Sequence, residues 1–350
     1  MGIRAKLLGL AERGSLPDWL IRAAVRRLSE QTSNKARCTD PVERAQRIAA
    51  WIAEMDASPI AIAPVESNEQ HYEVASAFFE QVLGPHRKYS SAYWTQDTTS
   101  LERAEENALE QSCTHAELAD GQKILELGCG WGSLTLYIAA KYPKSHITAV
   151  SHSKSQRETI LSLARSRGLD NIDVITCDMN DFDPPHPGSY DRVVSVEMFE
   201  HMRNYRELMM RVAYWLKPGG KLFVHIFCHK DTAYPYVDSG APEDWMTRHF
   251  FAGGMMPSDD LLTHFQQDLR FEAQWRWNGS HYAKTLEAWL SMMDEHREAV
   301  WPTLVETYGD EVDVWWGRWR IFFMSCAEFF ALKDGKEWYV SHYRFVRPST

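Results

Sequence analysis

The chain lacks the features of a secreted, zinc-binding or membrane-spanning protein. Its six cysteines are scattered over 350 residues without a C-x-x-C pair, so neither a disulfide framework nor a metal site is indicated. The N-terminus, MGIRAKLLGLAERG, has no apolar signal core. The most apolar late stretch, residues 315–332, is interrupted by Arg318, Arg320 and Glu328, so it predicts a buried helix. We expect a reduced, cytoplasmic protein without stable membrane insertion.

An excess of basic residues is also absent. Lys and Arg total 38 against 48 Asp and Glu, which gives a net charge of -10 and an isoelectric point near 5.8. Because binding to phosphate backbones requires clusters of Lys and Arg, we expect no nucleic-acid partner. An acidic protein suits a cationic substrate, but solubility explains the same charge more simply.

Residues 1–88 have the pattern of a helical region. Apolar residues recur at helical spacing with arginines between them: Leu7, Leu8, Leu10, Trp19, Leu20, Ala23, Ala24 and Leu28. A basic amphipathic helix either docks on its own protein or lies on a membrane surface, and we favour docking. A polar, proline-containing stretch near residues 61–69 predicts a joint.

Strand and helix patterns alternate from residue 121 onward. Short apolar segments predict strands at 123–127, 146–150, 172–176, 192–196 and 221–227, and helices at 134–141, 155–167 and 205–216. This alternation is typical of a parallel sheet that is covered on both faces and binds ligands at the carboxyl ends of its strands. We therefore predict a Rossmann-like α/β domain over residues 89–350.

Beyond residue 229 the alternation stops. Residues 230–320 are rich in Trp, Met and His and contain helical stretches such as 285–296. They predict a helical, substrate-binding insert within the α/β domain. Residues 337–346 alternate like a closing strand.

The strongest local signal is the run E-L-G-C-G-W-G from Glu126 to Gly132. Glycines directly after a strand let the backbone pass close to a ligand. A dinucleotide fingerprint requires glycine or alanine at position 133, where this chain has Ser133. The carboxylate of Glu126 suits the ammonium group of S-adenosylmethionine, which has no pyrophosphate. Asp178, after the third strand, could accept a hydrogen bond from the adenine amino group.

Longer motifs carry a resemblance to a known family. YSSAYW (89–94), ELGCGWGSL (126–134), SHSKSQ (151–156) and VSVEMFEHM (194–202) resemble the cyclopropane fatty-acid synthase superfamily of methyltransferases. Within it, HIFCHKDTAYPY (225–236), HYAKTLEAWL (281–290) and EWYVSHYRF (337–345) are most similar to coclaurine N-methyltransferase-like enzymes. The resemblance covers residues 70–347. It implies a class I methyltransferase core with an N-terminal helical lid, and S-adenosyl-L-methionine as the cofactor.

The resemblance also implies roles for individual residues. The implied cofactor contacts are Tyr89, Ser90, Glu126, Gly128, Cys129, Gly130, Gly132, Ser151, Ser153, Gln156, Asp178, Met179 and Val196. The implied catalytic residues are Glu197, Glu200, His201 and Cys326, and the implied substrate contacts are Ser91, Tyr93, His225, Phe227 and Tyr282. Cys326 lies in an apolar run and fits a small buried residue better than a nucleophile.

Methyl transfer is an in-line displacement, so positioning supplies most of the catalysis. An alkylammonium group loses its proton only near pH 10, to judge by lysine, so a base assists attack by nitrogen. Glu197, Glu200 and His201 have the i, i+3, i+4 spacing that would place them on one helical face. We assign His201 as the base, Glu200 to orient it or hold the substrate cation, and Glu197 to anchor the amine. Alternatively, the acidic residues simply begin a helix.

The methyl acceptor stays open between two classes. Cyclopropane-forming relatives hold a bicarbonate ion with a cysteine, a glutamate, a histidine and a tyrosine. Glu200, His225 and Tyr282 match that set, but Ser91 replaces the cysteine, and Glu197 stands where the lipid enzymes often have glycine. Both departures favour a small, alkaloid-like secondary or tertiary amine over an unsaturated lipid chain. A non-catalytic cofactor-binding protein is a third alternative. The oligomeric state is open, with a homodimer as one option.

Overall fold

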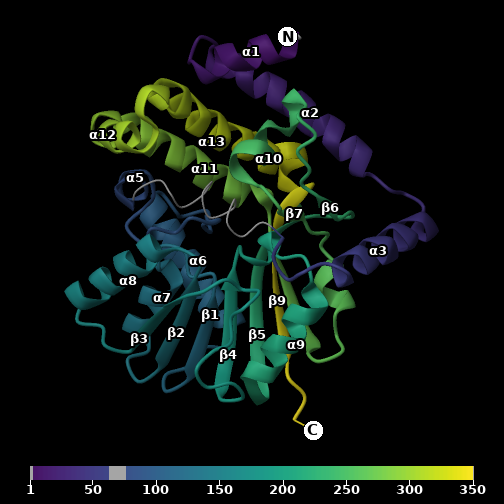
Figure 1. Ribbon diagram of the computed structural model, residues 1–350, viewed down its shortest axis with the longest axis vertical. Helices are drawn as coiled ribbons and strands as arrows, with labels where there is room; N and C mark the ends of the chain where they lie inside the picture. The colour runs from purple at the N-terminus through teal and green to yellow at the C-terminus, as the bar shows by residue number, and fades with distance from the viewer. Residues whose placement is uncertain (1–2, 63–75, 350) are drawn as a thin grey trace.

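The computed structural model describes residues 3–62 and 76–349. Most of the joint expected near residues 61–69 lies outside the described residues. The centre of the molecule is a seven-stranded sheet in the order β3-β2-β1-β4-β5-β9-β8 (Figure 1). Its strands are β1 (Lys123–Leu127), β2 (His146–Ser151), β3 (Ile172–Thr176), β4 (Tyr190–Val196), β5 (Leu216–His229), β8 (Arg270–Trp277) and β9 (Trp338–Val346). Strands β1 to β5 pair in parallel, and β9 is antiparallel to both β5 and β8.

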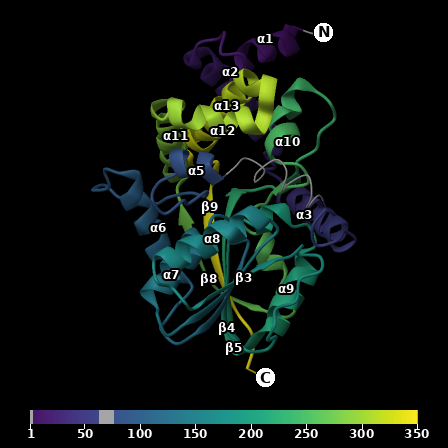
Figure 2. The same cartoon turned by 60° about the vertical axis from the view of Figure 1, so that its left-hand side comes forward.

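Helices cover both faces of the sheet, as the alternating pattern predicted. Figure 2 shows α6 (Leu101–His115), α7 (Ser133–Lys141) and α8 (Lys154–Ser166) on one side and α9 (Tyr205–Trp215) on the other. Ile124, Leu125 and Leu127 of β1 are all buried, as expected for a strand that is covered on both faces. The predicted strands and helices of residues 123–227 are confirmed, although β5 is longer at both ends than expected.

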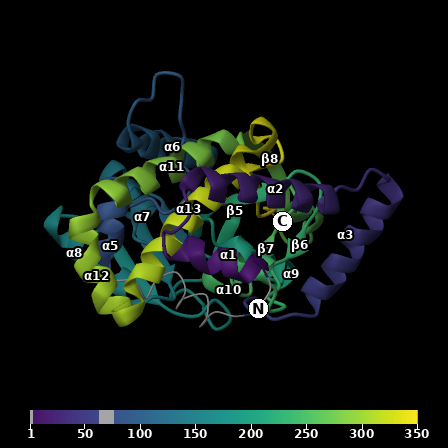
Figure 3. The same cartoon turned by 90° about the horizontal axis from the view of Figure 1, so that it is seen from above.

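The N-terminal region forms α1 (Ile3–Glu12), α2 (Asp18–Ala36) and α3 (Pro41–Asp56), and α5 (Ser76–Val82) follows. Seen from above, α1 and α2 lie across α13 (Val312–Gly335) (Figure 3). Arg22 of α2 forms ion pairs with Glu287 and Glu328, and Ser33 donates a hydrogen bond to buried Glu337. These helices dock on the rest of the protein, but not through the apolar face that the sequence predicted, because Leu7, Leu10, Trp19, Leu20 and Leu28 are exposed.

The C-terminal region contains more than helices. Its elements are β6 (Tyr234–Pro235), α10 (Trp245–Phe250), β7 (Met255–Met256), α11 (Gly279–Glu295) and α12 (Arg297–Tyr308), with α13 after them. The expected helix at 285–296, the buried helix at 315–332 and the closing strand are present as α11, α13 and β9. Residues 230–320, however, also supply β8, which forms the edge of the main sheet. No helix of the described ranges is long and apolar enough to cross a membrane.

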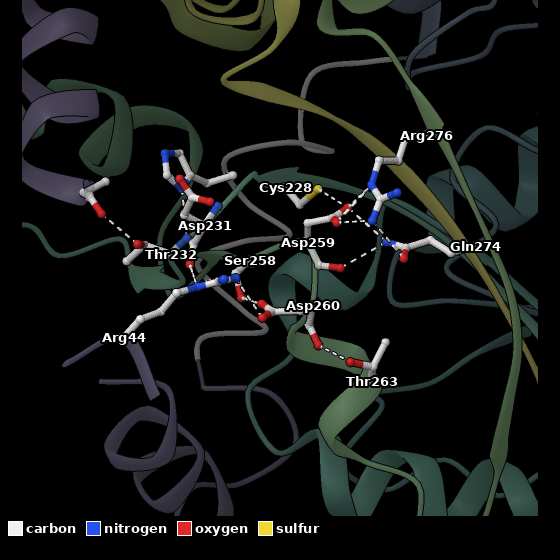
Figure 4. A network of polar contacts seen from close by, with 12 residues as sticks. Arg44, Cys228, Asp231, Thr232, Ser258, Asp259, Asp260, Thr263, Gln274 and Arg276 are labelled. Atoms are coloured by element: carbon white, nitrogen blue, oxygen red, sulfur yellow. Dashed lines mark hydrogen bonds and ion pairs between the residues drawn. The ribbon is translucent and has the colours of Figure 1, made fainter. Parts of the chain in front are cut away.

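A polar network fastens the loop after β7 to this edge of the sheet (Figure 4). Asp259 accepts hydrogen bonds from Gln274 Nε2 (2.9 Å) and Arg276 Nε (2.9 Å) of β8. The neighbouring Asp260 pairs with Arg44 of α3 at 2.7 Å. The loop therefore connects α3 to the sheet edge that carries β8 and β9.

Candidate active site

A cavity opens at the carboxyl ends of the parallel strands, where the alternating pattern predicted ligand binding. It is lined by residues that follow β1, β2, β3 and β4, and by the segment 87–90 between α5 and α6. Eleven of the thirteen expected cofactor residues line it: Tyr89, Ser90, Glu126, Gly128, Cys129, Gly130, Ser151, Gln156, Asp178, Met179 and Val196. The other two, Gly132 and Ser153, are the N-caps of α7 and α8. They do not line the cavity, but they begin the helices that follow its two loops.

The glycine loop brings bare backbone to the cavity. Gly128, Gly130 and Gly132 have φ values of +76°, +51° and +84°, a region that favours glycine. A Cβ atom on Gly128 would lie 2.7 Å from Cβ of Met198. The first glycine is therefore required both by the turn and by close packing against the segment after β4.

Glu126 projects from β1 into the cavity lining and is 2% exposed. Its carboxylate accepts a hydrogen bond from Thr135. Burial raises the pKa of Glu126 to about 8, because a charged carboxylate is disfavoured away from water. An ammonium group placed beside it would stabilise the ionised form.

Unsatisfied polar atoms in the lining test whether S-adenosylmethionine fits. Among the described residues, Gln156 Nε2, Trp131 Nε1 and Ser133 Oγ are buried and have no hydrogen-bond partner, and all three residues line the cavity. Buried polar groups without partners are costly, so their clustering here marks places for ligand acceptors. Gln156 fits the ribose hydroxyls, and Asp178, which also lines the cavity, has an acceptor for the adenine amino group. The donor set fits the cofactor.

Glu197, the residue that directly follows β4, lines the cavity. Its Oε1 accepts from the Ser91 backbone N (3.1 Å) and from His225 Nε2 (3.1 Å), and its Oε2 accepts from the Tyr282 hydroxyl (2.6 Å). Burial raises the pKa of Glu197, an effect that the nearby Lys88 opposes. The structure thus brings three of the expected substrate residues, Ser91, His225 and Tyr282, onto one carboxylate.

The expectation that Glu197, Glu200 and His201 share one helical face is wrong. Glu197 has a φ of +48°, and only Phe199–His201 form a short 3-10 helix. The left-handed residue reverses the chain after β4, so helical spacing does not apply. Glu200 is absent from the cavity lining. Its Oε1 accepts the Phe227 backbone N–H at 2.7 Å, and its buried Oε2 has no hydrogen-bond partner among the described residues.

His201 does line the cavity, together with Glu197. Burial lowers the pKa of His201 to about 4, while Glu197 raises it. The imidazole is therefore neutral at pH 7, and the carboxylate of Glu197 is the group that raises its basicity. Each of the two residues shifts the pKa of the other, so the charge of the carboxylate and the charge of the imidazolium would stabilise each other.

The remaining expected residues, Cys326, Tyr93 and Phe227, are absent from the cavity lining. Burial and Glu197 raise the pKa of the Cys326 thiol, so it stays protonated and suits packing better than nucleophilic attack. Tyr93 stacks on His281 with ring centroids 4.5 Å apart and does not line the cavity. Phe227 is 6% exposed and belongs to the apolar core that includes residues of α11 and α13.

The sequence interpretation missed Lys88. This residue lines the cavity and is 3% exposed, and its ammonium donates to Ser91 O at 2.7 Å. Burial lowers the pKa of Lys88 to about 8. Its position next to the Tyr89–Ser90 pair was the available signal, but a lysine in a loop is usually exposed. It holds in place the segment that presents Ser91 to Glu197.

Comparisons with known proteins agree with this geometry. Residues 61–338 match the model of the family described as mycolic acid cyclopropane synthetase. The chain is 38% identical over 287 residues to an (S)-coclaurine N-methyltransferase of Thalictrum flavum subsp. glaucum, covering 80% of this chain and 78% of that one. It is 30% identical to the cyclopropane-fatty-acyl-phospholipid synthase of Escherichia coli strain K12, over 79% of this chain and 68% of that one.

A solved structure is similar over almost the whole length. The crystal structure of coclaurine N-methyltransferase bound to N-methylheliamine and SAH has a TM-score of 0.93 and 31% sequence identity, covering 97% of this chain and 99% of that one. The predicted class I core and N-terminal helices are therefore confirmed. The chain belongs to the mycolic acid cyclopropane synthetase family and is an S-adenosylmethionine-dependent methyltransferase.

Proposed function

We propose that this enzyme transfers the methyl group of S-adenosylmethionine to the nitrogen of a small secondary or tertiary amine. The observation that carries the proposal is the Glu197 carboxylate, only 10% exposed, in the lining of the cofactor cavity. A carboxylate held there by Ser91, His225 and Tyr282 is a binding site for an ammonium ion beside the sulfonium methyl. The names of the relatives, which include coclaurine and pavine N-methyltransferases, support the same class of acceptor.

The residues divide the chemistry between them in this proposal. Glu126, Gln156 and Asp178 hold the cofactor, whose sulfonium supplies an activated methyl group. Glu197 anchors the substrate ammonium, and neutral His201 takes its proton, so that the nitrogen lone pair is free to attack. Glu197 stabilises the resulting imidazolium. Glu200 supports the Phe227 backbone and acts through the shape of the pocket. We assign residues 1–88 to a lid and residues 230–320 to the acceptor side of the site.

The same geometry separates this function from lipid cyclopropanation. The resemblance implies that the counterparts of His225 and Tyr282 in the lipid enzymes hold a bicarbonate ion. Here both side chains donate to Glu197, and a bicarbonate ion would have to compete with a carboxylate of the same charge. We therefore expect turnover without bicarbonate.

The test measures S-adenosylhomocysteine release on two panels, one of small cyclic amines including benzylisoquinolines and one of vesicles with unsaturated phospholipids. Turnover on amines, unchanged by bicarbonate, is the expected result. Glu197→Gln keeps the size and hydrogen bonds of the side chain but removes its charge, so we expect kcat/KM for the amine to fall by about 10²–10⁴-fold with unchanged cofactor affinity. Turnover on vesicles alone, raised by bicarbonate, would refute the proposal.

A further inference from the structure

The Glu197 carboxylate is the first member of an unbroken chain of hydrogen-bonded side chains that leaves the active site. His225 Nε2 lies 3.1 Å from Glu197 Oε1, and His225 Nδ1 lies 2.8 Å from His342 Nε2. His342 Nδ1 in turn lies 2.8 Å from His115 Nδ1. The proposed function gives a role to His225, but it uses neither His342 nor His115.

The chain runs sideways across the sheet. His225 of β5 and His342 of β9 are directly opposite in the strand register, and Trp275 of β8 is opposite His342. His115, the last residue of α6, stacks on Trp275 with centroids 4.0 Å apart and an interplanar angle of 5°. Exposure rises along the path from 0% at His225 and His342 to 8% at His115. The path therefore joins the buried carboxylate to the rim of the sheet.

The hydrogen-bond pattern allows only one orientation while Glu197 is ionised. His225 must donate through Nε2, so its Nδ1 accepts from His342 Nε2–H, and His342 Nδ1 accepts from His115 Nδ1–H. Protonation of Glu197 reverses every donor in the chain and leaves a proton on His115 Nε2. The state of the carboxylate is thus linked to the tautomer of all three rings.

The charged groups around the chain keep it neutral. Burial lowers the pKa of all three histidines, that of His115 to about 4. Lys88 acts on His225 and His342, and Arg344, which donates to the His115 carbonyl oxygen, acts on His115. Glu117 and Glu272 pair with Arg344 at the rim. Neutral imidazoles carry one donor and one acceptor each, which is the arrangement that a proton relay requires.

We propose that His225, His342 and His115 form a relay that carries the proton released by methyl transfer from Glu197 to solvent. The inference rests on the proposed function, which produces such a proton: a substrate ammonium and the cofactor sulfonium give a methylated ammonium, S-adenosylhomocysteine and one proton. The N–C bond forms, and the electron pair of the breaking C–S bond stays on sulfur. His201 passes the substrate proton to Glu197. Glu197 then gives it to His225 Nε2 while His225 Nδ1–H passes to His342 Nε2, His342 Nδ1–H passes to His115 Nδ1, and His115 Nε2–H is released to water.

The decisive variants are His115→Gln and His342→Gln. A glutamine side chain can keep a hydrogen bond to its neighbour but cannot transfer a proton, so a merely structural role would survive the change. We expect kcat to fall by about tenfold or more, with unchanged KM for the amine and unchanged cofactor affinity. The matched control is His146→Gln, at the N-terminal end of β2 and so away from the cavity, where the imidazole lies 2.8 Å from Asp173.

Two further measurements distinguish the relay from damage to the fold. In His115→Ala, which removes the ring beside Trp275, added imidazole should restore kcat, because it can occupy the vacated position and exchange protons with solvent. In the wild-type protein labelled with ¹⁵N-histidine, we expect His342 as the Nε2–H tautomer and His115 as the Nδ1–H tautomer at neutral pH. Opposite tautomers, or a failure of imidazole to restore activity, would count against the relay.

The outcomes separate the two proposals. If wild-type protein methylates amines and both glutamine variants retain its kcat, the relay is overturned and the proposed function stands. If wild-type protein methylates no amine, the proposed function fails and the relay fails with it. A loss of kcat in His115→Gln and His342→Gln alone, with recovery by imidazole in His115→Ala, supports both.

Discussion

At the scale of single residues, the site contains two carboxylates, Glu126 and Glu197, that are largely shielded from water. Glu126 faces the cofactor cavity, and Glu197 faces the position proposed for the amine. Burial raises the pKa of each, so each gains most from a positively charged partner. Binding of a sulfonium amino acid would therefore be coupled to loss of a proton from Glu126.

Glu126 gives a pH dependence whose sign is fixed by its pKa. Because that pKa is about 8 in the free protein, most of the carboxyl is protonated at pH 7, and it must ionise to pair with the cofactor ammonium. We expect the Kd of S-adenosylmethionine to fall by about tenfold from pH 6 to pH 7 and to level off above pH 8. Calorimetry in two buffers of different ionisation enthalpy should show release of about one proton at pH 7.

The control for this prediction is Glu126→Gln, which removes the titrating group but keeps an acceptor for Thr135. Its cofactor affinity should be weaker and independent of pH over the same range. Wild-type binding without proton release would show that Glu126 is already ionised, or that it does not meet the ammonium group.

At the scale of elements, the turn between β1 and α7 depends on Gly128. Its φ of +76° and the 2.7 Å approach to Met198 exclude a side chain. We expect Gly128→Ala to lose detectable cofactor binding by calorimetry. Gly121→Ala is the matched control, since Gly121 also has a positive φ, of +85°, but nothing lies within 4 Å of its would-be Cβ. Equal loss of binding in both variants would attribute the effect to backbone strain alone.

The contact between α1 and α13 gives a test of the docked N-terminal region. A Cβ atom on Gly317 would lie 1.8 Å from the Glu12 carbonyl oxygen. We expect Gly317→Ala to lower the free energy of unfolding by about 1–3 kcal/mol. Gly9→Ala, in the interior of α1 with no atom within 4 Å, should instead raise it by about 0.5–1 kcal/mol. Urea denaturation of both variants measures the two signs, and equal signs would contradict the observed packing.

The elements also show what could be predicted from sequence. The glycine loop and the strands of residues 123–227 could be predicted from hydrophobic periodicity and turn residues, because short-range sequence patterns determine such elements. Strand β8 was missed although Phe271, Ala273, Trp275 and Trp277 alternate with polar residues, because the surrounding helical patterns dominated the interpretation. The turn at Glu197 could not be predicted, since a left-handed glutamate is set by its tertiary contacts.

At the scale of the whole molecule, the central sheet and the C-terminal helices both contribute hydrogen-bond donors to Glu197. The carboxyl ends of the parallel strands supply most of the cofactor cavity, whereas α11, which packs on α13, supplies Tyr282. Motif positions located eleven cofactor residues of the cavity lining in advance, together with Glu197 and His201. They gave no indication that His115 and His342, more than 200 residues apart, are hydrogen-bonded behind the site, because only the assembled sheet brings α6 and β9 together.

The most direct test of the central claim is the position of the transferred methyl group. Wild-type protein and Glu197→Gln would be incubated with [methyl-¹³C]S-adenosylmethionine and an equimolar mixture of a cyclic amine and vesicles of unsaturated phospholipid, and the products would be examined by NMR. The account predicts label on the amine nitrogen with wild-type protein and little or none with Glu197→Gln. Label in the lipid chains, or undiminished amine labelling with the variant, would contradict it.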